Sequence, residues 1–161
     1  MSENHSMKTS AISALAFFVL LSSSAVLAHK FEKNGITVGH PWARATPEGM
    51  TAGAGYLKIT NTGKDADKLL SGTFENAKAT EFHEMKDEGG VMKMRALSGV
   101  EIKPGETLIF APGGNHLMFM GLSKPVVPGT VYKGTLTFEK AGSIDVEFKA
   151  EPVGALESAD R

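Results

Sequence analysis

Short runs in which apolar and polar residues alternate make up most of the chain from residue 36 onward. A period of two places successive side chains on opposite faces of a β-strand. Turn-forming pairs such as Gly89-Gly90, Gly113-Gly114 and Pro128-Gly129 separate the runs. This spacing predicts an antiparallel β-sandwich or barrel. The expected strands cover residues 36–38, 56–60, 80–85, 91–97, 108–110, 116–120, 132–138 and 144–148.

Methionine and histidine are concentrated in two of these runs. Histidines 83 and 116 fall there, together with five of the eight methionines, namely Met85, Met92, Met94, Met118 and Met120. Any one of these residues alone is better explained by packing, because Met fills gaps in cores and a single His on an apolar face is usually hydrogen-bonded. Their combination in two segments of matching parity indicates a binding site instead.

The first of these runs has the sequence of a hairpin. A turn over residues 87–90 would place Met85 opposite Met92 and His83 opposite Met94, on one face of the pair. A two-residue loop at Gly89-Gly90 would slide the pairing but keep the faces. A one-residue bulge would send Met94 to the other face. The role of Met94 as a ligand therefore depends on the register of this hairpin.

The candidate ligands are His83, Met94, His116 and Met118, with ten, twenty-one and one residues between them. All four are neutral and soft or borderline donors, which suit Cu(I) better than zinc, calcium or magnesium. A blue-copper electron-transfer site is excluded because it requires a Cys thiolate, and the chain has no cysteine. We expect one Cu(I) per chain, held as cargo, provided that the fold brings the two runs together.

Three segments resemble a known family, the PCuAC periplasmic copper(I) chaperones: HEMKDEGGVMKMRAL, PGGNHLMFMGL and HPWARATP. The resemblance covers nearly all of residues 36–152, and the spacing of all four ligand positions matches. It implies a cupredoxin-like, Greek-key β-domain with Cu(I) bound by His83, Met94, His116 and Met118. It also implies that copper is delivered to cytochrome c oxidase or to its assembly proteins. Some relatives carry a second site in a His- and Met-rich C-terminal extension, which the ending EPVGALESADR does not resemble.

The N-terminal region has the pattern of an export signal. Lys8 precedes an apolar run over residues 11–20, and Ala28 offers a small residue for cleavage. We expect a signal peptide over residues 1–28, a copper-binding β-domain over 29–152 and a tail over 153–161, in a protein located in the periplasm. An uncleaved membrane anchor is the alternative, because residues 11–28 approach the length of a spanning helix.

Composition restricts the possible partners. The net charge is −1 and no basic run occurs, which argues against nucleic acid or an anionic membrane as the main partner. Without cysteine, neither disulfides nor lipid attachment to a cysteine is available to the sequence. We expect a monomer without stable membrane association once the signal is cleaved.

The sequence is also compatible with functions other than that of a copper chaperone. A copper-dependent oxidative enzyme could use His29 as a mature N-terminal ligand together with His40, although a terminal residue is seldom ordered. A periplasmic copper-tolerance carrier and a purely structural sandwich with a Met-lined core are further alternatives. Nucleophilic catalysis has no motif in its support, so no enzyme activity is expected.

Trp42 is expected to pack on the core, with a cation–π contact to the metal as the lesser alternative. The acidic residues near the candidate site are expected to form a solvated rim: Glu81, Glu84, Asp87 and Glu88.

Overall fold

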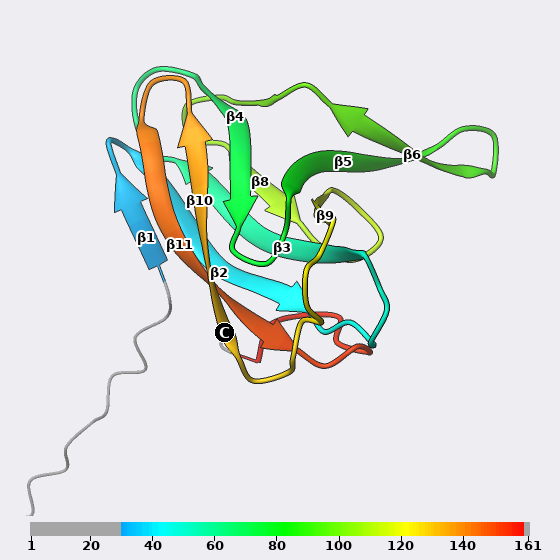
Figure 1. The fold of residues 1–161 in the computed structure, drawn as a ribbon. Helices are drawn as coiled ribbons and strands as arrows, with labels where there is room; N and C mark the ends of the chain where they lie inside the picture. The colour runs from blue at the N-terminus through cyan, green and yellow to red at the C-terminus, as the bar shows by residue number, and fades with distance from the viewer. Residues whose placement is uncertain (1–29, 160–161) are drawn as a thin grey trace, which may run out of the picture.

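The computed structural model describes residues 30–159, and every regular element in that range is a β-strand (Figure 1). Within residues 30–159 there is no helix long and apolar enough to cross a membrane. The strands are β1 (Lys30–Lys33), β2 (Ile36–Arg44), β3 (Ala52–Asn61), β4 (Asp67–Phe74), β5 (Ala79–Asp87), β6 (Met92–Leu97), β7 (Val100–Ile102), β8 (Thr107–Phe110), β9 (His116–Met120), β10 (Val131–Phe138) and β11 (Gly142–Glu151).

The strands form one sheet in the order β6-β5-β9-β3-β2-β11-β10-β4-β7, with β1 added to β2 and β8 added to β3. All pairs are antiparallel except β11 with β2. The sheet curls so that β4 and β9 face each other across the interior, because Phe74 and Phe119 stack there with ring centroids 4.0 Å apart. The expected cupredoxin-like, all-β fold is confirmed.

Aromatic side chains fill the core that the curled sheet encloses. Phe119 of β9 is fully buried and packs edge-on against Phe148 of β11, with centroids 5.5 Å apart. Gly55 of β3 allows this packing, since a Cβ at that position would collide with the Phe119 ring. Leu117 and Phe119 thus anchor one face of β9 in the core, and this fixes the alternate residues of the strand on the outer face.

Three strands were not expected from the sequence. The first, β1, is mostly exposed, and β7 is only three residues long, so neither carries a clear alternation. In β4 the burial pattern is irregular because its pairing with β10 shifts register between Thr137 and Phe138. The second strand, β2, is also longer than expected. It continues through His40 and Pro41 by way of an irregularity between Gly39 and Trp42.

Asp67 is a buried carboxylate that joins the start of β4 to the turn between β10 and β11. Its Oδ1 accepts hydrogen bonds from the backbone N–H groups of Lys68 and Lys140, and its Oδ2 accepts one from Ala141. Burial raises the pKa of this carboxyl, but the three N–H donors outweigh burial, so the pKa lies below its ordinary value of 3.8.

We expect Asp67→Asn to lower the free energy of unfolding at neutral pH by about 2–3 kcal/mol, because an amide cannot accept all three backbone hydrogen bonds. The folded-state pKa lies below the unfolded one. The contribution of the carboxylate is therefore fully present above the unfolded pKa and is lost as pH falls through the folded value. Urea unfolding of both proteins should show a difference that shrinks below about pH 4. A difference that stays constant down to that pH would contradict this role.

Candidate metal site

The four candidate ligands lie on one face of three adjacent strands, β6, β5 and β9. His83 of β5 is directly opposite His116 of β9, and their ring centroids are 5.5 Å apart. Met118 lies two residues beyond His116 on the same face, opposite Glu81. The expectation that the two runs share a face, with Met94 on the same side as His83, is confirmed.

The register predicted for the hairpin between β5 and β6 with a turn over residues 87–90 is wrong by two residues. Met85 is opposite Met94, and His83 is opposite Ala96. The turn is the two-residue loop Gly89-Gly90, in which both φ angles are positive, 70° and 85°. A tight turn of type I′ requires this backbone at both positions and favours glycine there. The alternative register left open by the sequence is therefore the one adopted, and the faces are unchanged.

Met94 and Met118 consequently lie on opposite sides of the histidine pair along the strands. Met94 is diagonal to His83 toward the hairpin turn, and Met118 is diagonal to it in the other direction. Diagonal neighbours on a sheet are about 7–8 Å apart, within reach of long side chains. The histidines thus form the centre of the cluster, with one flexible thioether on each side.

With both imidazoles neutral, the hydrogen bonds of each histidine leave one ring nitrogen without a proton. His116 Nδ1 is 3.0 Å from the carbonyl of Gly114, and a carbonyl only accepts, so Nδ1 carries the proton and Nε2 has a lone pair. His83 Nε2 is 2.7 Å from the Glu81 carboxylate, which likewise makes Nε2 the donor. The remaining nitrogen, Nδ1 of His83, is buried without a hydrogen-bond partner among the described residues. An orphaned nitrogen and a second bare one fit a pair of metal ligands.

Glu81 makes a contact with a candidate ligand that sequence reasoning missed. Its side chain is 49% exposed, as expected for a solvated rim, and it is also hydrogen-bonded to His83, two positions along the strand on the same face. That i, i+2 spacing on a strand was the available signal. The other rim residues pair away from the histidines: Glu84 with Arg95, Glu88 with Lys93, and Asp87 with the Gly90 N–H.

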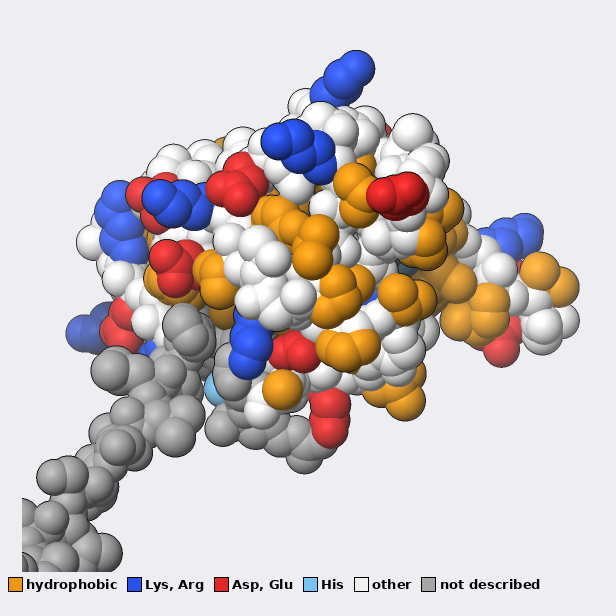
Figure 2. Space-filling model, turned by 60° about the horizontal axis from the view of Figure 1, so that its bottom comes forward, with side chains coloured by type: hydrophobic (Ala, Val, Ile, Leu, Met, Phe, Trp, Pro, Cys, Tyr) orange, Lys and Arg blue, Asp and Glu red, His pale blue; other side chains and the backbone are white. Residues whose placement is uncertain are grey.

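Burial changes sharply across the cluster. The His83 side chain is 12% exposed and His116 is 8% exposed, whereas Met94 is 50% exposed. Met118 is half-buried and lines an apolar hollow of about 290 Å³ beside Met50 and Val153. Figure 2, in which the lower end of Figure 1 comes forward, shows hydrophobic side chains gathered over the middle and right of that face. The cluster is therefore shallow, with an imidazole pair inside and thioethers at its margin.

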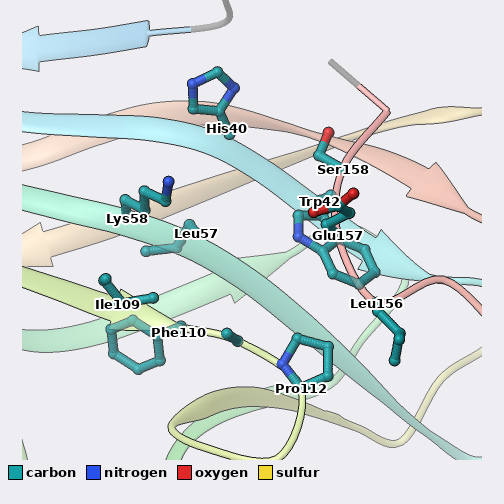
Figure 3. A pocket seen from close by; sticks show the side chains of 11 residues that line it. His40, Trp42, Leu57, Lys58, Ile109, Phe110, Pro112, Leu156, Glu157 and Ser158 are labelled. Carbon is teal, nitrogen blue, oxygen red and sulfur yellow. The ribbon is translucent and has the colours of Figure 1, made fainter. Parts of the chain in front are cut away.

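Trp42 lies in a different environment from the histidine pair. Its ring packs on the ring of Tyr56, with centroids 4.4 Å apart. The Arg44 guanidinium lies over the Tyr56 ring, 5.4 Å from its centroid. Burial raises the pKa of the Tyr56 phenol, and Arg44 partly offsets that effect. Trp42 and His40 line a hollow of about 510 Å³ between β2, β3, β8 and residues 156–158 (Figure 3). None of the four candidate ligands lines this hollow.

His29, the ligand required by the oxidative enzyme, lies outside the described residues, as does the expected signal peptide. His40 lies in the hollow of Figure 3, away from the lining of the hollow beside Met118. The residues of the described range therefore bring together His83 and His116, with Met94 and Met118 beside them, and they leave His40 apart from that group.

An all-β domain with a shallow outer cluster of histidine and methionine is the class of protein that these features define. Residues 36–150 match the family described as "Putative lipoprotein LpqE-like", and the chain belongs to this LpqE-like family. A relative from Leifsonia xyli subsp. xyli, "Putative lipoprotein Lxx21020", is 35% identical over 116 residues, which are 71% of this chain and 69% of the relative.

Two solved structures are similar over most of the chain. The apo PCuAC domain of PmoF2 has a TM-score of 0.69 and 26% identity, and the match covers 81% of this chain and 100% of that domain. The copper-bound PCuAC domain from PmoF2 has a TM-score of 0.67 and 27% identity, covering 77% and 98%. The resemblance to PCuAC proteins expected from the sequence is confirmed.

Proposed function

We propose that the protein is a Cu(I) carrier that binds the ion through His83, Met94, His116 and Met118 and hands it to an acceptor protein. The observation that carries the proposal is the opposed histidine pair on β5 and β9, in which each ring has one bare nitrogen. The copper bound to a PCuAC domain from PmoF2 supports the choice of ion.

The donor set favours cargo over a redox cofactor. Two imidazoles and two thioethers are neutral, soft or borderline donors that stabilise the reduced ion. Glu81 holds His83 through Nε2 and so orients Nδ1 toward the ion, as carboxylates commonly do for metal-bound histidines. Such a ligand set does not favour oxidation of the ion to Cu(II). Oxygen activation would require that oxidation, so the ligand set argues against it.

The exposed thioethers provide a route for release. Met94 is half exposed, so an acceptor thiolate or imidazole can approach the ion from that side. Replacement of the thioethers one at a time would then transfer Cu(I) without any change in oxidation state. The acceptor we propose is the copper centre of cytochrome c oxidase or one of its assembly proteins, met in the periplasm after export through the N-terminal signal.

We expect the Cu(I)-loaded protein to deliver its ion to an apo oxidase copper domain without sustained oxygen uptake. Absorbance of the acceptor and oxygen consumption would be followed in the same sample. The matched control is His40→Asn, a histidine outside the cluster whose positive φ of 49° asparagine tolerates. This control should transfer normally, and His83→Ala should not. Oxygen uptake that depends on His29 would contradict the carrier function and support the oxidative enzyme instead.

A further inference from the structure

The hairpin of β5 and β6 projects from the body of the protein and has two chemically different faces (Figure 1). On one face, Glu84 is paired with Arg95 and Glu88 with Lys93. The other face continues the strand positions of His83 outward through Met85 on β5 and through Met94 and Met92 on β6. One side of the arm thus carries paired charges, and the other carries three thioethers with Asp87 at its outer end.

The three methionines are neighbours on that face. Met85 is directly opposite Met94, where Cβ atoms are about 4.5–5.5 Å apart. Met92 is two residues from Met94 on the same strand and diagonal to Met85. Each sulfur lies two bonds beyond its Cβ on a side chain with several rotatable bonds. Three thioethers at these positions can therefore converge on a single ion.

Packing does not explain this group. Met92 is 52% exposed and Met94 is 50% exposed, and neither belongs to the buried core. Methionine in a protein interior fills gaps between other side chains, whereas Met92 and Met94 lie exposed on the arm and Met85, opposite Met94, is half-buried. Asp87, the residue opposite Met92, already accepts a hydrogen bond from Gly90 and is a hard oxygen donor. The soft donors available on this face are the three sulfurs.

We propose that Met85, Met92 and Met94 form a second, outer site for a soft monovalent ion, Cu(I), on the hairpin. The inference rests on the proposed function for the identity of the ion. Three neutral thioethers without an imidazole should bind more weakly than the inner set. Met94 can join either set, because it is opposite Met85 and diagonal to His83. When Met94 binds the inner ion, Met85 and Met92 hold the outer one, which is a further reason for weaker binding there.

This sharing gives the outer site a role in transfer. Rotation of the Met94 side chain can keep one sulfur on the ion while Met85 and Met92 exchange for His83 and His116. The ion then moves between an exposed and a shielded position by ligand exchange, with no electron or proton transferred. An acceptor would meet Cu(I) first on the arm, at its exposed thioethers.

The test is an anaerobic Cu(I) titration of the full chain labelled with ¹³C at the methionine methyl groups. In wild type we expect two equivalents to bind, the first shifting the Met118 methyl and the second, weaker one shifting those of Met85 and Met92. Met85→Leu with Met92→Leu should abolish the second equivalent and leave the first at its wild-type affinity. Such substitutions conserve volume and usually cost under about 1.5 kcal/mol in stability. Met120→Leu, on the outer face of β9 opposite Ala79, is the matched control and should retain both.

Saturation of wild type at one equivalent, or a second equivalent that survives the double substitution, would overturn the outer site. Failure of the proposed function has a different signature. In that case the Met118 methyl would not shift and His83→Ala would leave the first equivalent unchanged, while Met85 and Met92 could still respond.

Discussion

Replacement of His116 by alanine is expected to lower the affinity for Cu(I) by a factor on the order of 100 or more. Loss of an outer partner of a metal ligand typically costs 10–100-fold, and removal of a ligand should cost at least as much. His116 is the more buried of the two histidines, and its Nδ1–H is fixed by the Gly114 carbonyl. The next residue on β9, Leu117, faces the core and so cannot replace the lost imidazole.

Competition with a chromogenic Cu(I) chelator would measure this loss. The control His40→Asn removes an imidazole from the hollow of Figure 3 and should leave the affinity unchanged. Glu81→Gln should give an intermediate result, since the amide can still contact His83 but no longer supplies a charged acceptor. Equal affinities for wild type and His116→Ala would remove the histidine pair from the site.

Phe119→Ala is expected to reduce the free energy of unfolding by about 3–5 kcal/mol, whereas Met118→Leu should change it by less than about 1.5 kcal/mol. These neighbours on β9 face opposite ways. Phe119 is fully buried and stacks on Phe74 at 4.0 Å between centroids, while Met118 lies on the outer face beside the histidines. A loss of this size is a large share of the stability of an ordinary domain.

The two substitutions should have reversed effects on copper. Met118→Leu removes a sulfur donor and should weaken Cu(I) binding with little effect on folding. Phe119→Leu, a milder core substitution, should lower the melting temperature but leave the affinity of the folded protein unchanged. Thermal unfolding and chelator competition on the same samples separate the two effects. A large loss of stability in Met118→Leu with normal copper binding would assign Met118 to packing.

Local alternation was sufficient to predict the side-chain faces of the site. Because side chains on a strand alternate with a strict period of two, the spacing of His83 and Met85, and of His116 and Met118, fixed which residues would lie together. The same rule placed Leu117 and Phe119 on the core side. It failed for β4, where a register shift interrupts the alternation, and for β1 and β7, which are too exposed or too short to show it.

The register of the hairpin between β5 and β6 could be determined only from the conformation of its turn. Several loops were compatible with the glycines near residue 89, and the choice depends on whether both central residues adopt positive φ, which a sequence permits but does not impose. The adopted turn moved Met94 from opposite His83 to opposite Met85. That shift by two residues keeps Met85, Met92 and Met94 on one face, as in either register, and moves Met94 one step outward from His83 toward the hairpin turn.

The sequence by itself determined an all-β domain, the identity of the soft donors and the face on which each one lies, because these follow from residue chemistry and from a period-two backbone. Only the tertiary structure decided that β9 pairs with β5, and so that His116 is opposite His83 although 32 residues (116 − 83 − 1) separate them. It also decided that Glu81 orients His83 and that the arm projects into solvent. The physical reason is that pairing between distant strands is selected by the burial of the whole core, here around Phe74, Phe119 and Phe148, and not by local preferences.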